Sequence, residues 1–212
     1  MMMKKSTPQA GFTLVELSIV LVVIGLIIGG VLSGKQIMLN AQVTNVANAI
    51  QAFQAQFQTY VQNYGAMPGD DATAKERFSS AGIPANTTNS NGRLDDDVSF
   101  DSTTDNVETR LLWADMRGAG LVKGAGSNQN QPTTPFGGVY GFQNGAFTGT
   151  ASFTTNVLCL SAVPGDAAGS IDSRLDDGVR NTGSIMASDS TTSAVEGATY
   201  DSAKTYVMCS KL

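Results

Sequence analysis

The chain contains no histidine, only two cysteines and one tryptophan among its 212 residues, and its charged residues make up just 15% of the total. Histidine is the usual general base of enzymes, and histidine and cysteine supply most zinc ligands. The absence of histidine excludes histidine-based catalysis, so we do not expect an enzyme. The formal net charge of -5 and the lack of a basic stripe give no indication of nucleic-acid contact.

One long hydrophobic run does occur, from Phe12 to Leu32, and Glu16 is its only charged residue. A segment of about 20 apolar residues is long enough to cross a bilayer as a helix. An acidic side chain within such a segment costs roughly 2 to 3 kcal/mol on insertion scales. Two lysines precede the run and Lys35 follows it, so the leader should stay in the cytoplasm and the rest should be exported.

The small residue beside this run, Gly11, comes before the apolar segment. An ordinary secretory signal has small residues after its apolar core, where a peptidase removes the core. Cleavage after Gly11 would instead remove residues 1–11 and keep the apolar helix as the mature amino terminus. Glu16 would then remain in the membrane, where a buried charge is tolerated only when it is paired.

These residues resemble a known processing signal. Lys4 and Lys5 followed by the run Gly11–Leu17 are similar to the class III signal of type IV pilins and of type II secretion pseudopilins. The resemblance implies that a prepilin peptidase cleaves between Gly11 and Phe12 and that Phe12 is N-methylated. It also implies that Glu16 neutralises the amine of a neighbouring subunit during assembly. A plain single-pass anchor with a stray acid is the alternative.

A second pattern extends the apolar run into a longer helix. Apolar residues then recur at spacings of three and four, which is typical of one face of a helix; they are Val43, Val46, Ile50, Phe53, Phe57, Tyr60 and Tyr64. We therefore expect one helix over 12–64, with a transmembrane and polymerisation half at 12–34 and an amphipathic half at 35–64. The second half should pack on the protein's own sheet, although a coiled coil also fits. Gly65 and the sequence Met67-Pro68-Gly69 should end the helix.

The following segment carries a second resemblance. The order Tyr64–Asp70, Asn91–Leu94, Glu108 with Leu111–Trp113, and Ala119–Val122 is similar to a large group of bacterial prepilin-type proteins. With the amino-terminal signal, this resemblance covers about the first 125 residues. Read from the residues alone, Asp105 or Asn106 should cap a short packing helix that ends at Gly118.

Residues 65–212 should form a globular head. Short runs of β-branched and aromatic residues at 139–142, 151–159, 183–187 and 205–209 predict an antiparallel sheet, and with the helix they indicate an α+β fold. Cys159 and Cys209 end two of these runs in an exported head, so we expect a disulfide, with two free buried thiols as the alternative. The pilin resemblance implies that Gly165–Ala203 is an exposed, variable surface.

Only the Asn- and Asp-rich loops are candidates for site chemistry. Asn89, Asn91, Arg93, Asp95 and Asp96 form a candidate calcium loop, because oxygen ligands recur at alternate residues around a turn-making glycine. The alternative is a solvated turn whose Asn side chains bond their own backbone. A later acidic loop, 171–178, should make a turn rather than a metal site. Apart from calcium, no cofactor is expected.

Together these features predict a structural pilin subunit that polymerises into a type IV pilus-like filament. The resemblance implies a prepilin peptidase, an inner-membrane assembly platform and minor pilins as partners. The precursor would span the inner membrane once with its head in the periplasm, before joining a surface pilus. A pseudopilin of a periplasmic pseudopilus is the first alternative. A membrane-tethered binding protein or hydrolase is the second, but no Gly-x-Ser-x-Gly elbow supports it.

Overall fold

The computed structural model describes residues 11–84, 89–94 and 99–212. The chain divides into two compact units, Met1–Ala41 and Gln42–Leu212, and helix α1 (Leu14–Tyr64) belongs to both. The described part also contains two short helices, two longer ones and four strands. They are α2 (Ala74–Arg77), η1 (Ser79–Ala81), α3 (Glu108–Gly118), β1 (Tyr140–Ala146), β2 (Phe153–Pro164), α4 (Gly165–Leu175), β3 (Ile185–Ser188) and β4 (Thr205–Lys211).

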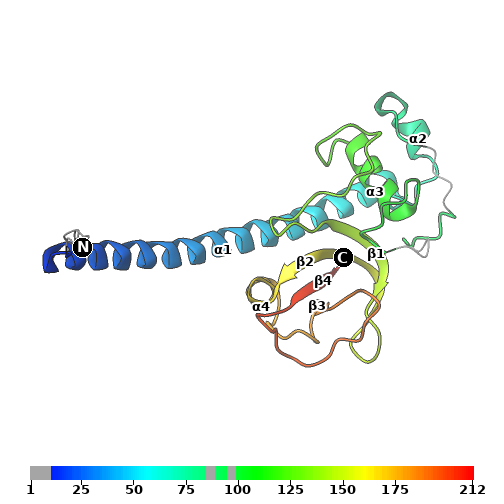
Figure 1. Ribbon diagram of the computed structural model, residues 1–212. Coiled ribbons are helices and arrows are strands. Elements are labelled where there is room, and N and C mark those ends of the chain that lie inside the picture. The colour runs from blue at the N-terminus through cyan, green and yellow to red at the C-terminus, as the bar shows by residue number, and fades with distance from the viewer. Residues whose placement is uncertain (1–10, 85–88, 95–98) are drawn as a thin grey trace, which may run out of the picture. The chain divides into compact units, whose positions relative to one another are not determined.

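The strands form one antiparallel sheet in the order β1-β2-β4-β3 (Figure 1). All four predicted strands and the α+β fold class are confirmed. Main-chain hydrogen bonds from loops cover both edges of the sheet: Asn144 N donates to Leu94 O beside β1, and Ala187 N donates to Arg180 O beside β3. Each edge strand therefore has at least one of its outward main-chain groups paired with a loop, which shortens the row of groups open to another strand.

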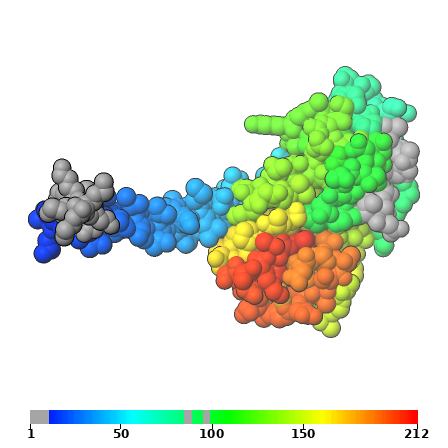
Figure 2. All heavy atoms as spheres, in the orientation of Figure 1, coloured from blue at the N-terminus to red at the C-terminus, as the bar shows by residue number. Residues whose placement is uncertain are grey.

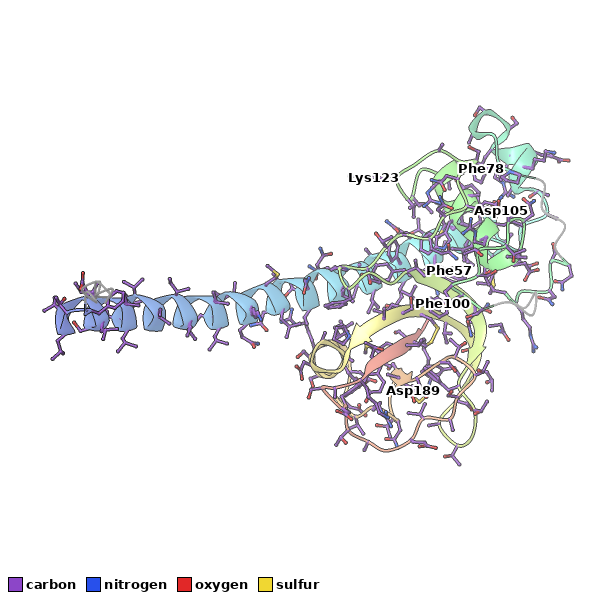
Figure 3. All side chains as sticks on the ribbon, in the orientation of Figure 1. Phe57, Phe78, Phe100, Asp105, Lys123 and Asp189 are labelled. Atoms are coloured by element: carbon purple, nitrogen blue, oxygen red, sulfur yellow. A yellow bond between two sulfur atoms is a disulfide. The ribbon has the colours of Figure 1, made fainter. Side chains whose placement is uncertain are left out.

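One face of the sheet packs on the second half of α1 and on α3. Phe57 of α1 stacks on Phe142 of β1 with ring centroids 5.3 Å apart, and Phe53 meets Trp113 of α3 edge to face at 5.2 Å. Figure 3 labels Phe57 where the helix passes the sheet. At the end of β4, the side-chain amide of Gln54 in α1 donates to Lys211 O at 2.6 Å. The predicted packing of the amphipathic half on the protein's own sheet is thus confirmed.

The other face of the sheet holds a second apolar cluster, built from residues of the same strands together with Phe100 and Phe147, which lie outside the strands. Its buried members are Phe100, Ala146, Phe147, Phe153, Val157, Cys159, Met186 and Cys209. Cys159 and Cys209 are directly opposite each other in the β2–β4 register and form a disulfide, as predicted. Because β2 is buried on both faces, its central residues form a continuous apolar run instead of an alternating one.

Helix α1 ends as the sequence predicts. Tyr64 is its last residue, and Gly65 follows with φ +69°, donating its N–H to Val61 O at 2.9 Å. Only glycine adopts this left-handed conformation without a steric cost, so it stops the helix at a defined residue.

The expected cap of α3 was wrong. Val107 occupies the N-cap position and makes no side-chain capping bond. Asp105 instead pairs with the Arg110 guanidinium at 2.8 Å. Asn106, with φ +63°, exchanges two hydrogen bonds with the amide of Gln129. Both candidate capping side chains therefore have long-range or charged partners that a local pattern does not reveal.

Helix α4 was not predicted: within 165–203 the sequence analysis expected only the strand at 183–187, and the pilin resemblance implied an exposed, variable surface. A signal for it exists: Asp166 lies in the first turn, and Ala167, Ala168 and Ile171 form a short apolar stripe. All three apolar residues are buried, and α4 packs against β2, β3 and β4. Two glycines and several polar residues in the segment obscured this pattern.

Candidate assembly segment and the turn that ends the long helix

The first half of α1 is a helix with an exposed apolar surface. Large hydrophobic side chains from Phe12 to Met38 are exposed in the isolated chain, with Phe12 83% and Leu14 86% accessible. Among the described residues, α1 is the single helix long and apolar enough to span a membrane. About 20 residues at 1.5 Å each extend about 30 Å, which matches the hydrocarbon thickness of a bilayer. This apolar surface therefore needs an apolar environment in place of water.

Glu16 lies in the first turn of this helix and closes a capping box with Thr13. The Thr13 N–H and hydroxyl each donate to Glu16 Oε2 at 2.9 Å, and the Glu16 N–H donates to Thr13 Oγ1 at 3.2 Å. This is the reciprocal Thr-x-x-Glu arrangement that satisfies the free N–H groups at the start of a helix. The sequence contains this Thr-x-x-Glu signal, although only intersubunit pairing was predicted for Glu16. Within the described residues, no cation forms an ion pair with Glu16.

The four glycines of this half, at 25, 29, 30 and 34, do not interrupt the helix. A Cβ built at any of them would meet no atom within 4 Å. No steric contact within the described part of the chain therefore requires glycine at these positions. Small residues let neighbouring helices approach closely in membranes, which makes an intermolecular contact the natural reason for them.

The turn after α1 connects the segments of the second resemblance. Gly69 donates its N–H to Asp115 Oδ2 on α3 at 2.7 Å, and Asp70 Oδ2 accepts the N–H of Gly92 at 2.7 Å. Gly69 has φ +87°, and a Cβ there would lie 2.4 Å from the carbonyl oxygen of Glu108. The Pro-Gly-Asp sequence is thus a packing device: it fixes the end of α1 against α3 and the 89–94 loop.

Two carboxyl groups in this turn have opposite pKa shifts. Burial raises the pKa of Asp115 to about 7, because the main-chain bond from Gly69 compensates only part of the lost hydration. Burial also favours a higher pKa for Asp71, but hydrogen bonds from Thr73, Tyr60 and Arg77 outweigh it and hold the pKa of Asp71 below its usual value. Asp71 is therefore ionised and paired, and its partners anchor the start of α2 to α1.

Neither carboxyl group is an obvious catalytic residue. Asp115 is fully buried, so no substrate can reach it. Asp71 accepts from Tyr60 Oη at 2.9 Å and from Thr73 Oγ1 at 2.8 Å, which commits both of its oxygens to structural bonds. The perturbed groups of this turn act in folding.

The structure describes part of the candidate calcium loop. Asn89 Oδ1 accepts the N–H of Asn91 at 3.2 Å, and Asn91 Oδ1 accepts the N–H of Arg93 at 2.8 Å. These are Asx turns, in which the side chain bonds the backbone two residues ahead, as the alternative interpretation expects. Asp95 and Asp96 lie outside the described residues. Calcium binding by Asn89, Asn91, Arg93, Asp95 and Asp96 stays a prediction.

The later acidic segment brings Asp172, Asp176 and Asp177 together, with carboxylate oxygens within 4.8 Å of one another. Each accepts hydrogen bonds from protein groups: Asp172 from Tyr200 Oη, Asp176 from the N–H of Ile185, and Asp177 from the Thr182 hydroxyl. The three carboxylates therefore stabilise the connection between α4 and β3 by hydrogen bonds. This agrees with the expectation of a turn, although its first residues belong to α4.

Comparison with known proteins identifies the amino-terminal segment. The family model described as the prokaryotic N-terminal methylation motif matches residues 6–32. This motif is the signature of type IV pilins and pseudopilins, so the resemblance of the amino-terminal signal is confirmed. The match supports a pilin-type or pseudopilin-type structural subunit, and its apolar helix fits a membrane-anchored precursor. No curated protein and no solved structure has significant similarity to the chain.

Proposed function

We propose that the chain is a pilin that polymerises into a type IV pilus-like filament through the first half of α1. The observation that carries the proposal is the exposed apolar helix with one acid in its first turn, within the matched methylation motif. In the proposed sequence of events, a prepilin peptidase removes residues 1–11 and Phe12 is methylated. Segment 12–34 then forms the filament core, 35–64 joins it to the head, and 65–212 forms the outer surface.

The energetics require nearly complete burial of this helix in the filament. Each large apolar side chain gains about 1.5 to 3 kcal/mol when it leaves water, so a helix with this many exposed ones gains tens of kcal/mol in any apolar medium. A bilayer supplies that medium before assembly. Leaving the bilayer is feasible only if neighbouring subunits cover the same surface, which implies a tightly packed helical core.

Glu16 supplies the specific contact in this proposal. Its capping box gives hydrogen bonds to the carboxylate but no neutralising charge. The methylated amine at Phe12 of an incoming subunit would provide that charge, and pairing two desolvated charges makes the contact selective for one register. An inner-membrane platform and minor pilins would act as partners, with the head in the periplasm until the subunit joins a surface fibre.

Substitutions at Glu16 and Thr13 separate charge pairing from helix capping. Glu16→Gln keeps a carbonyl that can accept the capping bonds but removes the negative charge, whereas Thr13→Val removes the capping hydroxyl and keeps the charge. We expect Glu16→Gln to abolish filaments in sheared-fibre preparations and Thr13→Val to reduce them only modestly. Membrane fractions probed for the precursor control for insertion.

Normal filament yield from Glu16→Gln would refute the pairing role. Mass spectrometry of the mature chain tests the processing step separately: a polypeptide that begins at methylated Phe12 is expected, and one that begins after residue 34 would overturn the proposal. Fibres outside the cell would support a pilus. A short periplasmic fibre that appears only with a secretion system would indicate the pseudopilin alternative.

A further inference from the structure

Arg180 is a buried cation in the connection between α4 and β3. Only 7% of the residue is exposed. Its backbone is fixed on both sides, because its N–H donates to Ala198 O at 3.0 Å and its carbonyl accepts the N–H of Ala187 in β3. Its guanidinium carbon lies 5.3 Å from the centre of the Tyr206 ring. The side chain is thus held in one place by packing.

The guanidinium has few polar partners for so buried a group. Nε donates to Gly197 O at 3.3 Å, and within the described residues Nη1 and Nη2 have no hydrogen-bond acceptor and no ion pair. Arg110 provides the comparison, since it is also 7% exposed. Its guanidinium binds the Asp105 carboxylate at 2.8 Å and the side chains of Gln131 and Asn130. Nη1 and Nη2 of Arg180 are not among the described side-chain atoms that are both fully buried and unpartnered, so they keep contact with solvent and are accessible to a charged partner from outside the chain.

A cavity of about 330 Å³ opens beside Arg180. Its other lining residues are Ser188, Asp189, Ser193, Ala194, Glu196 and Lys204. Figure 3 labels Asp189 at the end of β3, and in Figure 2 this carboxyl-terminal part of the chain, orange to red, forms a continuous area of the visible surface. Asp189, Glu196 and Lys204 are exposed, whereas Arg180 is buried. The cavity therefore has a cationic buried wall and charges of both signs at its accessible side.

We propose that this cavity binds a carboxylate, with the Nη1 and Nη2 groups of Arg180 as its principal donors. A guanidinium presents two parallel N–H groups that match a planar carboxylate in a bidentate pair. The guanidinium carbon lies over the Tyr206 ring, and a cation–π contact of this kind does not use the N–H donors, which can still bind a ligand. Lys204 adds a second positive charge at the mouth.

The charges of the lining favour a carboxylate over a phosphate. Arg180 and Lys204 are balanced by Asp189 and Glu196, so the cavity is close to neutral overall. A phosphate dianion would meet the repulsion of both acids with two negative charges, whereas a carboxylate brings one. The carboxylate can belong to a free acid or to an acidic side chain of another polypeptide.

The test uses the full chain in a non-ionic detergent and follows the Nε–H resonance of each arginine by NMR while acetate is added. Sodium chloride at equal ionic strength and inorganic phosphate are the parallel titrations. We expect a saturable shift at Arg180 with acetate, none at Arg110, and a weaker response to phosphate. An acidic tetrapeptide with blocked ends is the second probe: competition with acetate indicates that a polypeptide carboxylate can also enter, and its failure restricts the ligand to free acids.

Variants identify the partner of Arg180. Arg180→Lys keeps the charge but loses the paired donors, and acetate should bind it at least about tenfold more weakly. Because this variant has no Nε–H at position 180, its titration and a matching one of the parent chain follow the main-chain N–H of residue 180. Glu196→Gln and Asp189→Asn should bind acetate as well as or better than the parent chain. The proposal fails if the parent chain gives no saturable shift, or if acetate binds only after one of these acids is neutralised, since that acid would then be the native counter-ion. The fluorescence of Trp113 in each variant checks that the head is folded.

Discussion

Asp115 should make the head more stable at mildly acidic pH than at alkaline pH. Its pKa is raised by burial from an ordinary 3.8 to about 7. Between these two values the folded protein holds a proton that the unfolded chain releases. The free energy of unfolding contributed by this group therefore falls as pH rises from about 4 to 7 and is constant above that. A shift of about 3 units at 1.36 kcal/mol each gives an upper limit of about 4 kcal/mol.

Other shifted carboxyl groups affect the same measurement in known directions. Asp71 has a lowered pKa, so the stability it provides is present at neutral pH and is lost only as pH falls below about 4. Burial raises the pKa of Asp172, so that group acts in the same direction as Asp115. The range from pH 5 to pH 8 thus isolates the raised groups, and substitution is needed to separate them.

Trp113 provides the assay, because it is the only tryptophan, is fully buried and lies two residues from Asp115. Denaturant unfolding of the detergent-solubilised chain, followed by its fluorescence at pH 5, 6, 7 and 8, should show stability falling with pH. Asp115→Asn should flatten most of this slope. Asp105→Asn is the control, because it removes one exposed carboxylate, the partner of Arg110, from near the start of the same helix and leaves Asp115 unchanged. Equal stability of the parent chain at pH 5 and pH 8, or an unchanged slope in Asp115→Asn, would refute the reasoning.

Three further predictions use the same fluorescence assay. Gly69→Ala should destabilise the head by about 3 kcal/mol or more, because its Cβ would collide with a main-chain carbonyl of α3. Gly65→Ala has a similar φ but open space around its Cβ, so it should destabilise the head by only about 1 kcal/mol. Equal losses would contradict the contact. Replacing Cys159 and Cys209 by alanine opens a loop of sequence separation 50 and should cost about 4 kcal/mol in the chain-entropy model; an unchanged midpoint would show that the bridge adds nothing. If loop 89–96 binds calcium, calcium at 100 times its Kd should raise the free energy of unfolding of the head by about 2.7 kcal/mol. An unchanged unfolding midpoint at millimolar calcium would exclude the site.

The elements that could be predicted from the sequence are those specified by local chemistry. The helix over 14–64 follows from an apolar run and then a three-four spacing, and its end follows from a glycine that must adopt a positive φ. The four strands follow from β-branched runs between turn residues. The pairing of Cys159 with Cys209 required only that two cysteines lie in an exported head.

The features that escaped prediction depend on contacts between distant segments. Asp105 and Asn106 look like caps by position, yet Arg110 and Gln129 engage them. Asp115 looks like an exposed acid near the end of a short helix, but it is fully buried, and burial raises its pKa while a main-chain bond from Gly69 offsets part of that rise. No periodicity in the sequence contains this information, because the bonded residue is 46 positions away.

The capping box of Glu16 is compatible with the intermolecular role that we propose for the same carboxylate. Both hydrogen bonds that its carboxylate accepts from Thr13 go to Oε2. The second oxygen, Oε1, therefore remains available for an ammonium group while the helix cap stays intact. Capping would fix the direction of the carboxylate before a neighbour arrives, which lowers the conformational entropy lost on pairing. On this argument Thr13→Val should slow filament assembly more than it lowers the final yield, and a time course of fibre formation measures that difference.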